Sequence, residues 1–268
     1  MYNARMCGKY KFIGCEIIYR EACHLAATSP HRVDLEFLLK GLHDLPRADM
    51  QGRIQAAIDA VDPQGGYEAI LLGYARCNDG LVGVRARDIP LVIPRAHDCI
   101  TFLFGGRDAF DQYFNANAGT FYTSTGWIER DKFDTMPSLP AYGRRGVMAN
   151  LGLDLSYEEM VEKYGAENAA FILQSLGDWR KNYSRCLYLE MGVCDEAACM
   201  QTARRRAQDN NWAFSAQKGS LELLRKLFAG QWDDDFVIVP PGGSIVARND
   251  KRILDSEPPP ASEGGKMQ

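Results

Sequence analysis

Four side chains with sulfur or nitrogen donors each follow a short apolar segment of this sequence. Cys15 lies near the end of the first such segment, Cys77 follows the third, and His97 and Cys99 follow the fourth. Thiolates and an imidazole form a tetrahedral donor set that suits Zn²⁺. The donors come from three separate segments, which favours a site built into a preformed fold over a small zinc ribbon. We therefore expect a metal site at these four residues, and the alternative is four small buried packing residues.

Acidic side chains and a second histidine lie close to these candidate ligands. A metal-bound histidine usually donates its other ring N–H to a carboxylate or a carbonyl, and Asp98, Asp79 or Glu16 could accept it. Four protein ligands would close the site, whereas three would leave a position for water or a substrate thiol. We expect His43, Asp98 and Glu16 to handle protons. For His43, the alternative is that it has no chemical role and lies in a loop whose Asp44 caps the next helix.

Cationic and aromatic residues flank the same segments and are candidates for substrate binding. Arg76 and Arg95 suit a carboxylate or phosphate. Tyr74 lies in the turn before Cys77, and Trp127 ends an aromatic segment that could cover a ligand or simply plug the sheet edge. The chain has no GxxxxGK[ST] motif and no complete dinucleotide-binding glycine motif, so nucleotide binding is disfavoured.

The remaining cysteines are interpreted differently. The chain has eight cysteines in 268 residues and four histidines, too few cysteines for a disulfide scaffold. The first ten residues hold no apolar run of signal-peptide length, so we expect a reducing, cytoplasmic compartment with free thiols. Cys7 is assigned to the tail, and Cys23 and Cys186 are assigned to packing. The roles of Cys194 and Cys199 stay open.

Charge and hydropathy exclude two classes of partner. The formal net charge is −4, which provides no basic field for a nucleic-acid backbone, and the basic run 204–206 is expected on a solvated helix face. No stretch reaches about 18 uninterrupted apolar residues, so we expect no membrane span. The expected ligand is therefore a small molecule.

Strands and helices must position these candidates, and the sequence alternates between their two patterns. Short apolar runs beside turn residues predict strands covered on both faces, and helices between them predict parallel connections. Strands are predicted at 10–18, 33–38, 69–73, 90–94, 185–191 and 236–239. Helices are predicted at 46–61, at 97–114 with a break near Gly105, from a capping Ser156, and at 166–179, 195–209 and 220–228.

These elements predict an α/β fold of three-layer, Rossmann-like parallel sheets, in two related lobes with a cleft between them. Open α/β sheets bind ligands beyond the carboxyl ends of their strands, where the candidate metal ligands lie. The expected divisions are an N-terminal tail at 1–9, a first lobe with the metal site at 10–130, a loop or lid at 131–155, a second lobe at 156–247 and a disordered tail at 248–268.

Several motifs resemble a known family. The segments 41–44, 71–78, 94–99 and 125–127 are similar to those of the domain-of-unknown-function family 1638 of bacteria and archaea, and the resemblance spans about residues 10 to 243. The family's cysteine after the first strand matches Cys15, its glycine-tyrosine-cysteine motif matches Cys77, and its histidine-aspartate-cysteine motif matches residues 97–99. The sequence departs from the family pattern at Ala75 and Ala96, and neither of these is one of the matched positions.

The resemblance implies a function in one-carbon chemistry. Members are often encoded beside corrinoid-dependent methyltransferase systems, which implies a zinc-dependent methyl or one-carbon transferase with a corrinoid protein or methyltransferase as partner. Zinc would lower the pKa of a thiol acceptor, and the thiolate is the nucleophile. Two alternatives stay open: a non-catalytic metal- or corrinoid-binding accessory protein, and an iron–sulfur protein using the same thiolates.

Overall fold

The computed structural model describes residues 7–131, 157–176 and 179–259. Of the predicted N-terminal tail at 1–9, the structure describes residues 7–9, and Lys9 already begins the first strand. The predicted loop or lid at 131–155, apart from residue 131, and the predicted cap Ser156 lie outside the described residues. Within the described ranges the protein is a mixed α/β structure with parallel sheets and helices, as the sequence predicted. No helix in these ranges is long and apolar enough to cross a membrane.

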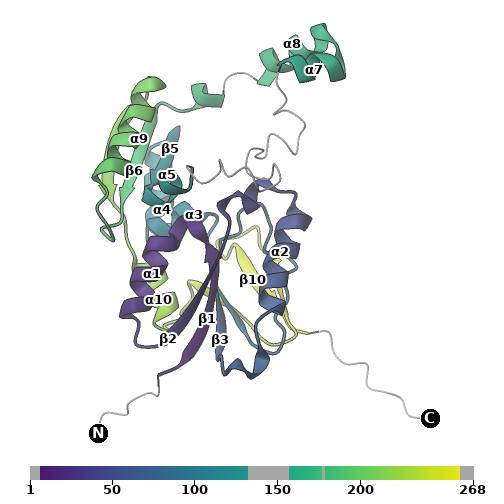
Figure 1. The fold of residues 1–268 in the computed structure, drawn as a ribbon, viewed down its shortest axis with the longest axis vertical. Coiled ribbons are helices and arrows are strands. Elements are labelled where there is room, and N and C mark those ends of the chain that lie inside the picture. Colours follow the sequence, from purple (N-terminus) through teal and green to yellow (C-terminus); the bar gives the residue numbers. More distant parts are fainter. Residues whose placement is uncertain (1–6, 132–156, 177–178, 260–268) are drawn as a thin grey trace, which may run out of the picture.

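A five-stranded sheet forms the centre of the molecule (Figure 1). Its order is β2-β1-β3-β4-β8; the first four strands are parallel, and β8 runs antiparallel to β4. The strands are β1 (Lys9–Cys15), β2 (Arg32–Leu38), β3 (Ala69–Gly73), β4 (Leu91–Pro94) and β8 (Phe236–Val239). All residues of β3 and β4 are buried, which explains their unbroken apolar runs.

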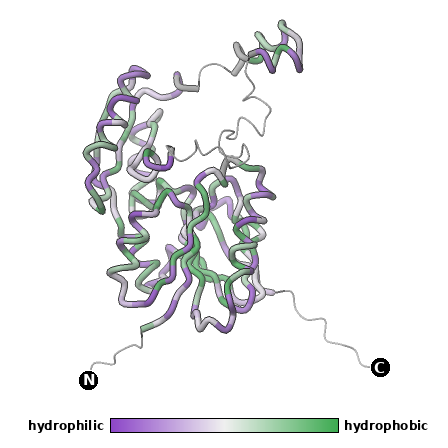
Figure 2. Tube along the Cα trace, viewed as in Figure 1, coloured by the Kyte–Doolittle hydropathy of each residue, from purple (hydrophilic) through white to green (hydrophobic). Residues whose placement is uncertain are grey.

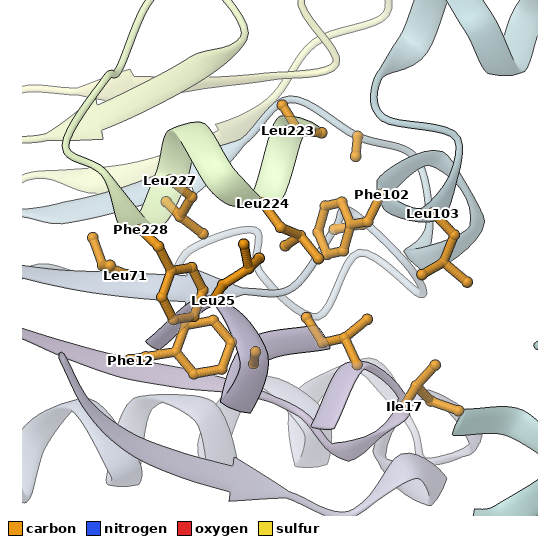
Figure 3. Close-up of a cluster of buried hydrophobic side chains, with 14 of the residues drawn as sticks. Phe12, Ile17, Leu25, Leu71, Phe102, Leu103, Leu223, Leu224, Leu227 and Phe228 are labelled. Atoms are coloured by element: carbon orange, nitrogen blue, oxygen red, sulfur yellow. The ribbon is translucent and has the colours of Figure 1, made fainter. Parts of the chain in front are cut away.

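Helices cover both faces of this sheet. Helices α1 (Tyr19–Thr28) and α10 (Glu222–Phe228) pack on one face, where Phe12, Leu71 and Phe228 share a core cluster (Figure 3). Helix α2 (Arg47–Asp59) covers the other face, where Ile13 and Leu72 belong to a second cluster. Successive strand residues point to opposite faces, so β1 and β3 contribute to both clusters. Figure 2 shows the resulting concentration of hydrophobic residues along the central strands.

A second, three-stranded sheet is parallel throughout, with the order β5-β6-β7. Its strands are β5 (Thr120–Ser124), β6 (Arg185–Glu190) and β7 (Ala213–Lys218), and α9 (Ala197–Asp209) packs on them. The aromatic segment that ends at Trp127, for which the sequence predicted no strand or helix, forms β5 and the start of α5 (Thr125–Asp131). β7 was not predicted because all of its residues except Phe214 are exposed and Phe214 is its only large apolar side chain, which leaves no apolar signature.

The sheets cross the predicted lobe boundaries. β5 precedes residue 130 but pairs with β6, whereas β8 falls in the predicted second lobe but pairs with β4 of the first sheet. Hydrophobic patterns identify a strand without naming its partner, so these pairings were not visible in the sequence. The remaining helical elements of the described residues are η1 (Glu16–Ile18), η2 (Lys40–Asp44), η3 (Pro63–Gly65), α3 (Cys99–Leu103), α4 (Arg107–Ala116), α7 (Tyr157–Tyr164), α8 (Ala166–Leu176) and η5 (Trp179–Asn182).

The prediction that residues 248–268 form a disordered tail is wrong for the first part of this segment. β9 (Ser244–Ala247) and β10 (Leu254–Glu257) form an antiparallel hairpin. Ile253 and Leu254 are buried in the cluster beneath α2, and the Arg95 guanidinium donates hydrogen bonds to the carbonyls of Arg252 and Leu254. Apolar burial and these hydrogen bonds order a segment whose composition is mostly polar.

Candidate functional site

A pocket of about 420 Å³ lies beyond the carboxyl ends of β1, β3 and β4. Three of the four predicted metal ligands, Cys15, Cys77 and Cys99, line it. We call it the thiol pocket. Tyr74, Asp98 and Trp127, also singled out from the sequence, belong to its wall together with Lys40. All three thiols are free and partly buried.

Each cysteine reaches the pocket from a different element. Cys15 is the last residue of β1, and Cys99 is the first residue of α3. Cys77 lies in the turn after β3 with a φ of 42°, a left-handed conformation, and its N–H donates to the carbonyl of His97 at 2.8 Å. This hydrogen bond ties the turn after β3 to the loop after β4. The parallel register of the sheet therefore brings together three residues that are distant in the sequence.

The thiols in this pocket hold their protons tightly. Burial raises the pKa of Cys15 to about 12, and the nearby Cys77 adds to the rise, while the Lys40 ammonium opposes it. Burial likewise raises the pKa of Cys77 to about 12 and that of Cys99 well above its ordinary value, with Asp98 contributing to both. Thiolates close together in a site of low polarity repel one another, so they need a compensating cation.

His97 does not join the three thiols. Its side chain is exposed and lines a different, polar pocket of about 390 Å³, together with Arg76. Adjacent residues on the two loops thus point to opposite sides: Cys77 and Asp98 face the thiol pocket, and Arg76 and His97 face the polar one. Among the described residues, no group of three or more His, Cys, Asp and Glu side chains is placed to hold a metal ion as the chain stands. The structure thus brings together the three predicted cysteine ligands without the histidine.

The three predicted proton-handling residues have separate surroundings. Asp98 lines the thiol pocket, but its carboxylate caps α3 by accepting hydrogen bonds from the N–H and hydroxyl of Thr101 at 2.9 and 3.0 Å. Glu16 accepts the backbone N–H of Lys40 at 2.9 Å and lies 3.5 Å from Arg130, so it positions the Lys40 segment. His43 lies in η2, and its side chain is outside the described residues.

The predicted substrate-binding residues also divide. Tyr74 and Trp127 line the thiol pocket, and burial raises the pKa of Tyr74 well above its ordinary value. Arg76 lines the polar pocket and pairs with Asp79 at 2.5 Å. Arg95 lines neither of these two pockets and holds the C-terminal hairpin instead. Cys194 and Cys199, left open by the sequence, do not line the thiol pocket.

Lys40 is a pocket residue that sequence reasoning missed. It is 6% exposed, and its ammonium lies 5.9 Å from the centre of the Trp127 ring. A single lysine next to a glycine carries no recognisable motif, so only its position after β2, at the carboxyl edge of the sheet, could have drawn attention to it. Its charge gives the thiol pocket one buried cation that favours an anionic form of Cys15.

The comparisons with known proteins identify the family of the chain but not its function. A family model described as "Protein of unknown function (DUF1638)" matches residues 37–228, which is well over half of the chain. No curated protein and no solved structure matches the chain. The matched span includes Cys77, Cys99 and Trp127 of the thiol pocket, whereas Cys15 precedes it. The chain therefore belongs to this family of proteins of unknown function, DUF1638.

Proposed function

We propose that the thiol pocket is a zinc site at which a small molecule takes part in methyl or other one-carbon transfer. The observation that carries the proposal is that Cys15, Cys77 and Cys99, from three separate elements, line one pocket at the carboxyl edge of a parallel sheet. Soft thiolates suit Zn²⁺, and three protein ligands are the number typical of catalytic zinc. His97 belongs to another pocket, so the fourth position is left to water or substrate.

The chemistry of the donor set fits such an ion. The raised pKa values of Cys15 and Cys77 mean that the thiols are neutral at pH 7 unless a cation balances them. Binding of a divalent metal must therefore release protons, and affinity must rise with pH. The three side chains must also converge, because they do not form a ready-made metal cage. When bound, zinc would lower the pKa of a thiol acceptor and so supply a nucleophile at neutral pH.

The other pocket residues bind and orient the substrate in this proposal. Apolar residues such as Ile17, Leu42 and Phe102 line much of the pocket, which suits a small and largely apolar molecule. Lys40 supplies a positive charge beside Cys15, and the Trp127 ring closes one wall. Trp127 comes from α5, which follows strand β5 of the second sheet, so a residue next to that sheet lines the pocket. We therefore propose a Rossmann-like arrangement of two lobes that share a cleft.

The partner and the compartment are further parts of the proposal. We propose a corrinoid protein or a corrinoid-dependent methyltransferase as partner, on the basis of the gene neighbourhood implied by the family resemblance. We also propose a cytoplasmic location, which is supported by the eight cysteines being free. Both parts stand apart from the metal site. Co-purification with the native protein tests the partner, and fractionation of cells tests the location.

Metal analysis tests the site directly. The wild-type protein is expected to hold about one zinc ion per chain, and Cys77→Ala and Cys99→Ala are expected to lose most of it, because each removes one of three ligands. Cys23→Ala is the matched control, since Cys23 is a partly buried free thiol that does not line the pocket. Elemental analysis by mass spectrometry measures the metal content.

Three results would contradict this assignment in different ways. Unchanged zinc in both pocket variants would exclude the cysteines as ligands. Iron with acid-labile sulfide would replace the proposal by an iron–sulfur protein. A corrinoid absorption spectrum in a protein without zinc would replace it by a corrinoid-binding accessory protein.

A further inference from the structure

The outer edge of β7 is an uncovered side of the second sheet. β7 pairs with β6 on its inner side, and it has no other strand partner in the part of the chain that the structure describes. All of its residues are exposed except the half-buried Phe214. We propose that this edge binds the same edge of a second copy of the chain, so that two three-stranded sheets become one sheet of six strands. The proposal concerns a surface away from the thiol pocket and does not depend on a metal.

The backbone of β7 offers hydrogen-bonding groups to such a partner. The Ala213 N–H donates to the carbonyl of Ser184, and the Gly219 N–H donates to that of Glu190, so the odd-numbered residues direct their backbone groups towards β6. Because successive residues of a strand alternate in direction, residues 214, 216 and 218 direct their N–H and C=O groups outwards. A row of such groups at a sheet edge is a template for another strand.

The edge of β7 also lacks the features that usually keep another strand away. At the edge of the first sheet, Asp34 and Glu36 of β2 form ion pairs with Lys9 and Lys11, and charges of this kind oppose strand addition. Residues 213–217 contain no charged residue and no proline, and their register with β6 has no bulge. A second strand can therefore approach β7 without burying a charge.

The charges at the two ends of β7 favour a second copy as the partner. Asp209 ends α9 shortly before β7 begins, and Lys218 is the last residue of β7. Both side chains are exposed, and neither makes an ion pair with another described residue. Antiparallel pairing about a two-fold axis places the end of one strand beside the beginning of the other. It therefore brings Lys218 of each copy towards Asp209 of the other copy, twice in one dimer.

The direction of the side chains agrees with this pairing. Lys218 lies four residues after Phe214, so both side chains point to the same face of the sheet. Phe214 packs against the cluster that contains Ala203 of α9, which identifies this face as the one that α9 covers. The carbonyl end of α9 carries a partial negative charge, to which Asp209 adds, so a lysine from a second copy is favourable there.

Light scattering coupled to size-exclusion chromatography of the full chain tests the proposal. The wild type is expected to form a dimer that dissociates on dilution. Ala216→Pro should weaken dimerisation at least about tenfold, because proline removes an outward N–H and leaves the hydrogen bonds to β6 intact. Asp209→Lys and Lys218→Asp should each weaken it as well, and the double variant should restore it. Lys251→Asp is the control, because it makes the same charge change in the C-terminal hairpin.

Three results would overturn the assignment: a wild type that is monomeric at every concentration, a dimer that persists in Ala216→Pro and in both single charge variants, or a double charge variant that remains as weakened as the single ones. The first result would leave the edge to a different partner. Asp209 and Lys218 are exposed, so the charge variants keep the test valid even if Ala216→Pro fails to fold. Circular dichroism of each variant checks that the fold is kept.

Discussion

At the scale of single residues, burial decides how ionisable groups behave in this protein. Cys15 and Cys77 have a pKa of about 12 because they are buried at a sheet edge, with Lys40 as the nearby cation opposing the rise at Cys15. Such thiols are poor nucleophiles at neutral pH without a further positive charge. The same physics acts on Glu21 of α1, which is 1% exposed. Burial raises its pKa to about 7, and the nearby Glu196 adds to the rise.

Glu21 should make the stability of the protein depend on pH. Its pKa is raised in the folded state, so the folded state binds more protons than the unfolded chain between about pH 4.5 and 7. The free energy of unfolding should therefore fall as pH rises through this window, by about 3 kcal/mol from this group. Urea unfolding of the wild type and Glu21→Gln across this range measures the effect. The glutamine variant should lose this part of the slope; an identical pH profile in the two proteins would disprove the assignment.

At the scale of elements, the Thr-Gly-Trp segment at the start of α5 shows how a short motif builds a wall of the pocket. The Thr125 hydroxyl lies 2.6 Å from that of Tyr188, which ties the helix to β6. A Cβ atom at Gly126 would lie 1.7 Å from the carbonyl oxygen of Ile17, so only glycine lets α5 approach η1 this closely. Trp127 then reaches the thiol pocket.

Gly126→Ala should therefore displace α5 and open the pocket. The clash is with backbone, so relief requires moving the helix, and we expect a loss of at least about 2 kcal/mol in the free energy of unfolding. Tryptophan fluorescence should report a changed environment for Trp127. Gly52→Ala in α2 is the matched control: a Cβ there meets nothing within 4 Å, and alanine should stabilise the helix by up to about 1 kcal/mol. Equal stability of Gly126→Ala and the wild type would contradict this packing.

At the scale of the whole molecule, the two sheets share a hydrophobic core. The cluster that contains Phe12 of β1 and Phe228 of α10 also contains Leu187 and Leu189 of β6. This shared burial means that the strands of both sheets support the same pocket edge. The C-terminal hairpin completes the opposite face, where Leu254 packs in the cluster beneath α2. The described part of the chain therefore has no clean boundary at which one sheet could be separated without exposing apolar surface.

Truncation tests the role of the hairpin. A chain ending at residue 247 loses the buried Ile253 and Leu254, and each buried aliphatic side chain contributes about 1.5–3 kcal/mol. We expect a large drop in thermal stability. A chain ending at residue 259 is the control and should unfold at the wild-type temperature. Equal thermal denaturation of both truncated chains would show that the hairpin does not stabilise the fold.

The sequence by itself determined the α/β class, most of the strands and helices, and the family, because apolar periodicity and short motifs are local properties of a chain. It also indicated that Cys15, Cys77 and Cys99 follow strands, and parallel strands bring such positions to one edge. Only the tertiary structure decided that His97 points away from the thiols, since the direction of a loop side chain depends on long-range contacts. Strand pairing also depends on long-range contacts, and through them β8 joins the first sheet. The C-terminal hairpin held by Arg95 is ordered by the burial of its apolar side chains, which no local sequence pattern indicates.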